Sequence, residues 1–148
     1  MDGLRCVVCI PTRELFAGEI SYASVPSAEG YYGVLPGHEM IVAANKSGGV
    51  LTLNLDEAGK EKRQFLLYEG ASQVFNNILT VLGRFGVDVA NIDVDDVRAK
   101  ADKMRETIAQ LEADKGEDEQ ADVTLRISRK RLEWYEMQIK YVEENVHA

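Results

Sequence analysis

The chain has 148 residues, enough for one domain or two small ones. Its 25 acidic and 17 basic residues give a net charge of −8, which argues against nucleic-acid binding, because such proteins present a basic surface to the phosphates. Apolar residues make up 45% of the chain and charged residues 28%, close to the average of globular proteins, which excludes wholesale disorder. The sequence shows neither a long apolar run nor a secretory signal, so we expect a location on the cytoplasmic side.

Residues 1–90 consist of short segments with the residue pattern of β-strands, separated by residues that favour turns. All three prolines and all but one of the glycines lie in this half. Asp56–Gly59 and Asn76–Asn77 have the turn chemistry of β-hairpins. Many short strands predict an antiparallel sandwich or barrel. The expected strands are Leu4–Ile10, Glu14–Phe16, Ile20–Pro26, Gly33–Leu35, Ile41–Ala44, Val50–Leu55, Arg63–Tyr68, Ala71–Phe75 and Ile78–Leu82.

Cys6 and Cys9 form a C-x-x-C pair inside the first expected strand. Residues i and i+3 of a strand point to opposite faces and lie ~10 Å apart. That separation is too long for a disulfide, and the sequence offers no second cysteine pair for a metal site. We therefore predict two structural cysteines.

Residues 91–148 contain one glycine and no proline, and their apolar residues recur at spacings of three and four. This pattern predicts two helices, with arms of roughly 20 and 28 residues, that pack along narrow stripes. Asp93 or Asp95 can cap the first helix, Gly116 can end it within the break at 115–118, and Asp118 can cap the second. The stripes are Val94, Val97, Ala101, Met104, Ile108 and Leu111, then Leu125, Ser128, Leu132, Tyr135, Ile139, Val142 and Val146.

A second apolar strip, formed by Ile127, Trp134 and Tyr141, lies roughly 100° around the second helix. Such a strip is either an interaction surface or the face that packs on the protein's own sandwich, and the residues alone leave both open.

Groups that could perform catalysis are few. The two histidines are His38, in a Pro-Gly-His turn, and His147 near the end of the sequence. Neither has a serine or cysteine partner with a third member, and the sequence carries neither a P-loop nor a dinucleotide-binding glycine motif. We expect a chain that is not an enzyme.

Residues 25–38 read V-P-S-A-E-G-Y-Y-G-V-L-P-G-H. They predict a loop at Gly30, a short strand and a tight turn in which Pro36 presets φ and Gly37 takes positive φ. The string resembles the V-x-x-x-E-G-x-x-G-[IV]-L-P-G-H signature of the F-type ATP synthase epsilon subunit. Residues 68–74 and 77–82 are similar to later sandwich segments of that family, and residues from 92 onward to its helical hairpin.

The resemblance implies an α+β fold: an N-terminal antiparallel β-sandwich of about ten strands over residues 1–90, then a C-terminal α-helical hairpin over 91–148. It implies a non-catalytic rotor subunit, peripheral on the cytoplasmic side of a bacterial cell membrane. The sandwich would bind the gamma subunit and the ring of c subunits, and the hairpin would inhibit ATP hydrolysis in the alpha/beta hexamer.

The same resemblance assigns residues. The contact loop for gamma and the c ring would be Glu29, Gly30, Tyr31, Tyr32, Pro36, Gly37 and His38. The pair Tyr31-Tyr32 replaces the acidic or polar residue common in the family, which implies an apolar contact. The regulatory helix would act through Arg126, Arg129, Arg131 and Trp134, with Lys130 in the same basic cluster. The open alternative for that cluster is a solvated helix face.

Some bacterial relatives bind ATP through [IL]-D-x-x-R-A and a second arginine seven residues after the first. Asp95, Arg98, Ala99 and Arg105 resemble that motif, although Val94 replaces its first residue. No cofactor is required, and these residues make regulatory ATP a candidate ligand. The alternative is a helix cap and an arginine that stabilises the arm.

Two other functions stay open. A free nucleotide sensor would close its hairpin on ATP and lose binding in Arg98→Ala. A coiled-coil adaptor would form homodimers through the apolar stripes, whereas an intramolecular hairpin predicts a monomer.

Overall fold

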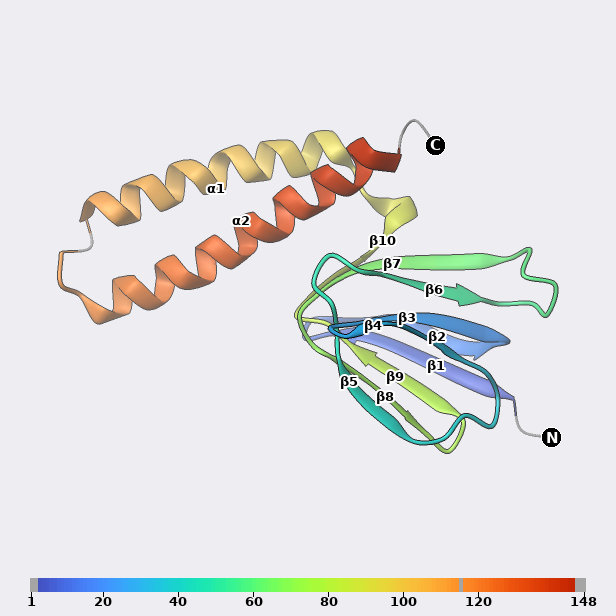
Figure 1. The fold of residues 1–148 in the computed structure, drawn as a ribbon. Helices are drawn as coiled ribbons and strands as arrows, with labels where there is room; N and C mark the ends of the chain where they lie inside the picture. The colour runs from blue at the N-terminus through green and yellow to red at the C-terminus, as the bar shows by residue number, and fades with distance from the viewer. Residues whose placement is uncertain (1–2, 115, 146–148) are drawn as a thin grey trace. The chain divides into compact units, whose positions relative to one another are not determined.

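The computed structural model describes residues 3–114 and 116–145, which divide into two compact units between Asn91 and Ile92. The first unit holds ten strands and a short 3-10 helix, Val89–Asn91, and the second holds two helices (Figure 1). The strands are β1 Leu4–Ile10, β2 Arg13–Ile20, β3 Tyr22–Ser27, β4 Gly30–Val34, β5 Ile41–Ala44, β6 Val50–Asn54, β7 Lys62–Tyr68, β8 Ala71–Phe75, β9 Ile78–Leu82 and β10 Phe85–Asp88.

The strands form two five-stranded sheets. Sheet A has the order β2-β1-β9-β8-β5, and sheet B has the order β10-β7-β6-β3-β4. The pairs are antiparallel apart from β1 and β9, which run parallel. Alternate residues of each sheet point inward, so the two inner faces share one core. Its fully buried members are Leu4, Cys6, Val8, Ala23, Val25, Val34, Leu51, Leu53, Phe65, Leu67, Val74, Leu79 and Val81.

The predicted sandwich and hairpin are confirmed, and four strands have the predicted bounds: β1, β5, β8 and β9. The prediction Glu14–Phe16 was too short, because β2 pairs with β1 along its full length, past Gly18 and around a bulge at Val8/Cys9. The prediction Gly33–Leu35 started too late. Strand β4 pairs with β3 directly from the turn at Ser27 and Gly30.

Strand β10 was missed altogether, and the ends of three other strands were one or two residues off. Strand β10 has four residues, including Gly86, and its extended form depends on pairing with β7. Such a segment carries little strand signal of its own. The missed ends belong to β3, predicted as Ile20–Pro26, to β6, predicted as Val50–Leu55, and to β7, predicted as Arg63–Tyr68.

Both predicted hairpin turns form. Asn76 and Asn77 have φ values of 51° and 60°, the left-handed pair that a two-residue turn between β8 and β9 requires. In the other turn, the Asp56 carboxylate accepts the backbone N–H groups of Lys60 and Glu61, at 2.8 and 3.1 Å. Asp56 thereby supplies the acceptor that the turn backbone lacks.

Cys6 and Cys9 lie on opposite faces of sheet A, as predicted, and both are free thiols. Cys6 is fully buried in the core, whereas Cys9 is half-buried. Burial raises the pKa of the Cys6 thiol to about 12. Cys6 is therefore a neutral core side chain at physiological pH.

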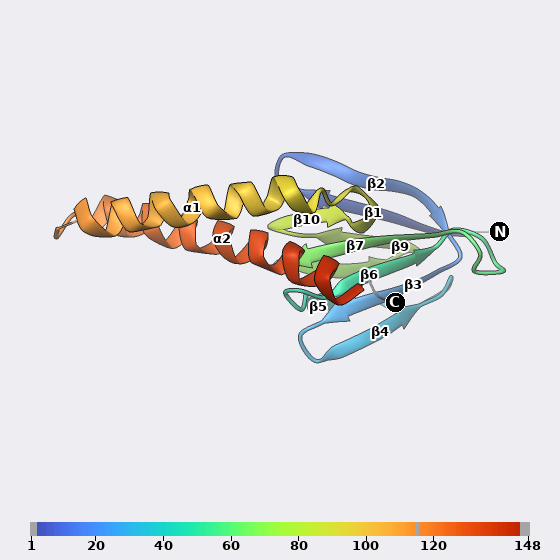
Figure 2. The ribbon, with the colours of Figure 1, turned by 90° about the horizontal axis from the view of Figure 1, so that it is seen from above.

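Helices α1 (Val94–Asp114) and α2 (Glu119–Asn145) lie side by side and antiparallel (Figure 2). Asp93 caps α1, because its carboxylate accepts the N–H of Asp96 at 3.2 Å. Asp118 caps α2 by accepting the N–H of Gln120 at 2.9 Å. Gly116 takes a φ of 54° in the connection. Lys115, Val146 and His147 lie outside the described residues.

The predicted stripes account for part of the helical burial. Val97, Ala101 and Ile108 of α1 are buried, and so is Leu125 of α2. The second strip is not uniform: Trp134 is 6% exposed, Tyr141 is half-buried and Ile127 is 48% exposed. Gln138, in neither predicted stripe, is buried as well.

Candidate functional site

The predicted contact loop begins at the turn between β3 and β4. The Ser27 hydroxyl donates to the carbonyl of Gly30 and accepts the N–H of Glu29 at 3.3 Å. Gly30 has a φ of 127°, a conformation that favours glycine. These bonds leave Glu29 and Gly30 exposed at the tip of the hairpin.

Two tyrosines follow the tip, and each is fixed by its hydroxyl. Tyr31, 53% exposed, accepts the N–H of Val50 at 3.0 Å. The Tyr32 and Ser72 hydroxyls share a 2.6 Å hydrogen bond that joins edge strand β4 of sheet B to β8 of sheet A. Burial raises the pKa of Tyr32, and the bond to Ser72 acts in the opposite direction. The uncharged Tyr32 side chain therefore links the two sheets, whereas the Tyr31 ring is exposed to solvent.

The loop ends in the predicted tight turn. The N–H of His38 donates to the carbonyl of Leu35 at 3.1 Å, and Gly37 has a φ of 84°. Gly37 also donates its N–H to the Asn77 side chain at 2.6 Å, which ties this turn to the β8–β9 turn. The contacts of His38 with other described residues are local: its Nδ1 lies 2.7 Å from the carbonyl of Glu39, and its ring is 6.5 Å from that of Tyr32. Pro36 is exposed.

A groove of about 440 Å³ opens beside this loop. Its walls are residues 27–32 and residues 41–44 of β5, so it lies between the edge strands of the two sheets. Glu29 is the one charged residue among those that line it.

A feature that sequence reasoning missed is the outer face of sheet A, formed by Val42, Phe75, Ile78 and Leu82. These side chains are 67%, 51%, 43% and 51% exposed. They come from neighbouring strands, because Phe75 pairs with Ile78. The signal lay in the run Ile78–Leu82, where Ile78 and Leu82 are apolar although they alternate with the buried Leu79 and Val81. Exposed apolar side chains gathered on one sheet face are typical of protein–protein interfaces.

The predicted regulatory residues lie along α2. Arg129 pairs with Glu112 of α1 at 3.1 Å, which makes it a contact within the hairpin. Arg126 and Arg131 are exposed, and Lys130 is half-buried.

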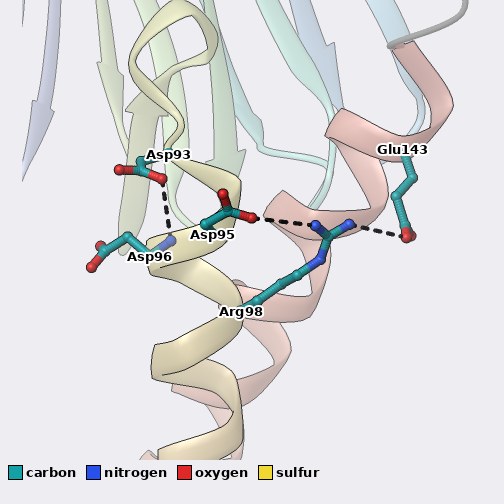
Figure 3. Close-up of polar contacts among 5 residues, drawn as sticks. All are labelled: Asp93, Asp95, Asp96, Arg98 and Glu143. Carbon is teal, nitrogen blue, oxygen red and sulfur yellow. Dashed lines mark hydrogen bonds and ion pairs between the residues drawn. The ribbon is translucent and has the colours of Figure 1, made fainter.

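The residues of the ATP motif lie near the start of α1. The Arg98 guanidinium reaches between Asp95, at 3.7 Å, and Glu143 of α2, at 3.5 Å (Figure 3). Arg105 repeats that arrangement two turns later, with Asp102 at 2.8 Å and Glu136 at 3.1 Å. Ala99 is exposed between them. Both arginines thus have the contacts expected of residues that stabilise the arm.

Over residues 3–114 and 116–145, the structure contains no cluster of metal-ligating side chains. Neither helix, within the same residues, is long and apolar enough to cross a membrane. A sandwich with a fixed loop and an uncovered apolar face, followed by a helical hairpin, defines a protein-binding subunit.

The comparisons identify the family. Residues 3–87 match the family described as "ATP synthase, Delta/Epsilon chain, beta-sandwich domain". The chain is 30% identical to the ATP synthase epsilon chain of Maricaulis maris, over 81% of this chain and 87% of the relative. It is 33% identical to that of Rhodopseudomonas palustris (strain BisB5), over 66% and 70%. The chain therefore belongs to the epsilon chain family of F-type ATP synthases, and it is a non-catalytic subunit.

Two solved assemblies contain chains of the same fold. A chain of the Euglena gracilis mitochondrial ATP synthase, OSCP/F1/c-ring, aligns with a TM-score of 0.55 at 20% identity, over 88% of this chain and 78% of that one. A chain of the Tetrahymena thermophila mitochondrial ATP synthase, central stalk/c-ring, aligns with a TM-score of 0.52 at 13% identity, over 93% and 97%. At these identities the likeness concerns the fold.

Proposed function

We propose that this chain is a central-stalk rotor subunit whose sandwich couples the gamma subunit to the c ring and whose hairpin inhibits ATP hydrolysis by the alpha/beta hexamer. The observation that carries the proposal is the outer face of sheet A, since four exposed apolar side chains on a rigid sheet fit burial against a protein partner. The contact loop adds a second surface, where Tyr31 is 53% exposed and its neighbours Leu35 and Met40 are 58% and 70% exposed.

The inhibitory role of the hairpin is supported by its construction. Few of its side chains are buried, and its helices are joined by ion pairs that are about half exposed. A hairpin held this weakly can exchange its own contacts for those of a partner at low cost.

The test is ATP hydrolysis by the assembled complex, with the full chain and with the chain truncated after Asn91, each with and without an ATP-depleting enzyme. We expect faster hydrolysis on truncation, with assembly and ATP synthesis retained. Unchanged hydrolysis would remove the inhibitory role from the hairpin and leave the sandwich as the functional part.

A matched pair of variants tests the outer face. Val42 and Val123 are both exposed, at 67% and 45%, but Val42 lies on the outer face and Val123 on α2. Val42→Asp places a charge at the proposed interface and should weaken incorporation of the chain into the complex by about tenfold or more. Val123→Asp should assemble normally, so equal assembly of the two variants would contradict the proposal.

We also propose that ATP binds at Arg98 and Arg105 and modulates the hairpin. The support is that the two guanidinium groups, 48% and 47% exposed, lie seven residues apart on one edge of α1. Phosphates bound there would replace Glu143 and Glu136 as their partners. Titration calorimetry with MgATP should show binding that Arg98→Ala removes and that Lys103→Ala, at another exposed cation of α1, retains. No heat with the parent chain would exclude the site.

Both helices pair within one chain, so we propose that the isolated protein is a monomer, and light scattering should give the mass of a single chain. A dimer would favour the adaptor function instead. We further propose a peripheral position on the cytoplasmic side of a bacterial cell membrane, as part of an ion-driven ATP synthase; the support is that the relatives from Maricaulis and Rhodopseudomonas are ATP synthase epsilon chains.

A further inference from the structure

Within the described residues of the hairpin, three ion pairs between α1 and α2 share one spacing. Arg98 pairs with Glu143 at 3.5 Å, Arg105 with Glu136 at 3.1 Å, and Glu112 with Arg129 at 3.1 Å. Successive members are seven residues apart on both helices, so the pairs follow one edge of the hairpin as a ladder. In the third pair the acidic residue, Glu112, lies on α1 and the basic residue, Arg129, lies on α2, which is the reverse of the first two pairs.

The exchanged third pair has a consequence for the register of the helices. A slip of one seven-residue repeat would keep the apolar stripes of α1 and α2 facing each other, at the cost of one repeat of overlap and of helix-end residues drawn into the short connection between Asp114 and Glu119. A slip of seven residues in one direction would bring Arg105 opposite Arg129. The opposite slip would bring Glu112 opposite Glu136. Either slip therefore places like charges together, which is destabilising.

We propose that this ladder selects the register of the hairpin and that ionic strength sets how firmly the hairpin is closed. The six side chains are 47–61% exposed, so salt screens their attraction. Asp95 and Asp102 lie on α1 beside Arg98 and Arg105 and hold their guanidinium groups toward α2. The inference concerns the free chain, and it rests on the proposed function only for its consequence in regulating ATP hydrolysis.

Two double charge exchanges of equal composition test the register. Glu112→Arg with Arg129→Glu keeps three ion pairs but places all three arginines on α1 and all three glutamates on α2. Either slip then brings opposite charges together. Arg105→Glu with Glu136→Arg also keeps three pairs, and in either slip one like-charged contact remains. We expect the first variant to populate slipped forms and the second to keep the parent register.

The readout is the distance between spin labels at Lys103→Cys and Lys140→Cys, in a background of Cys6→Ala and Cys9→Ser. A slip of one repeat shifts the helices by about 10 Å along their axes. We expect a single distance in the parent and in the Arg105/Glu136 exchange, and additional distances in the Glu112/Arg129 exchange. A single, unchanged distance in both variants would overturn the proposal, because the apolar contacts would then set the register.

Hydrogen exchange of the full chain tests whether these salt-sensitive ion pairs hold the hairpin closed. Between about 20 mM and 500 mM NaCl we expect helix amides to exchange about threefold faster, with core strands β7 and β9 as an unchanged internal reference. Arg105→Glu should accelerate helix exchange by about tenfold. Lys140→Glu changes the charge equally but disturbs only a pair within α2, with Glu144, and should stay within about twofold.

Helix exchange rates that do not respond to salt would contradict the proposal that the ion pairs hold the hairpin closed. Equal effects of Arg105→Glu and Lys140→Glu would contradict it as well. These experiments use the free chain, so their failure is distinct from a failure of the inhibitory role in the complex.

Discussion

The sandwich and the hairpin are stabilised in different ways. The sandwich buries 13 side chains completely between two sheets, and its strands pair across long distances in the sequence, as β1 does with β9. The hairpin buries a few side chains along thin stripes and adds half-exposed ion pairs. Burial of apolar area is worth far more than exposed charge pairs, so the sandwich is the more stable unit, which agrees with the coupling role proposed for it and the regulatory role proposed for the hairpin.

The largest expected effect is in the sandwich core. Phe65 is fully buried and contacts the Phe16 ring, with centroids 6.3 Å apart. Phe65→Ala should lower the free energy of unfolding of the sandwich by about 4 kcal/mol, measured by urea denaturation. The control is Phe75→Ala on the outer face, which should cost less than about 1 kcal/mol. Similar losses would mean that the core and the outer face of sheet A do not differ in their contribution to stability.

A smaller effect is expected where the sandwich ends. Asp88 is 13% exposed, accepts Arg63 at 2.8 Å and accepts the N–H of Ala90 at 2.9 Å. The Arg63 guanidinium also lies over the Phe16 and Phe65 rings. Asp88→Ala should therefore cost about 2 kcal/mol and speed hydrogen exchange at residues 89–91. The control Lys140→Ala removes an exposed ion pair and should cost under about 0.5 kcal/mol. Equal losses of stability in the two variants would contradict the conclusion that Asp88 stabilises the end of the sandwich.

In the hairpin, the helix cap gives a still smaller effect. Asp93→Ala removes the acceptor for the Asp96 N–H and should destabilise α1 by about 1 kcal/mol, seen as faster exchange in its first two turns. Asp95→Ala leaves the cap intact and should have less than half that effect. If Asp95→Ala proved the more harmful variant, the cap would be wrongly assigned.

The smallest effect under ordinary conditions is the pH dependence of Cys6. Its pKa is about 12 when folded and near the ordinary 9.0 when unfolded. Between these values unfolding releases a proton, so the stability contributed below pH 9.0 is lost as pH rises toward 12. Urea denaturation at about pH 8 and about pH 10.5 should show this loss in the parent chain. The Cys6→Val variant should lack the loss of stability that the Cys6 thiol causes. If the variant and the parent chain had the same pH profile, the raised pKa of Cys6 would be refuted.

Sequence reasoning succeeded where a local rule decides the structure. Asn76 and Asn77 predicted a two-residue turn because few other residues adopt positive φ cheaply, and Asp118 predicted a cap because helix N–H groups need an acceptor. It failed at β10, where a segment with a glycine becomes a strand only beside β7. For the candidate site, the sequence indicated the loop at 29–38 but not the outer face, since exposure depends on what covers a strand.

The sequence by itself determined the change from strands to helices near residue 91, the turns, the break between the two helices and the family. These follow from residue chemistry over a few positions, or from motifs whose order survives in the chain. Only the tertiary structure decided that Asp93 rather than Asp95 caps α1, that Tyr32 reaches Ser72, and that Arg98 and Arg105 meet carboxylates of α2. Those contacts join residues far apart in the chain or choose between equivalent neighbours, and only the packed backbone fixes the distances that select them.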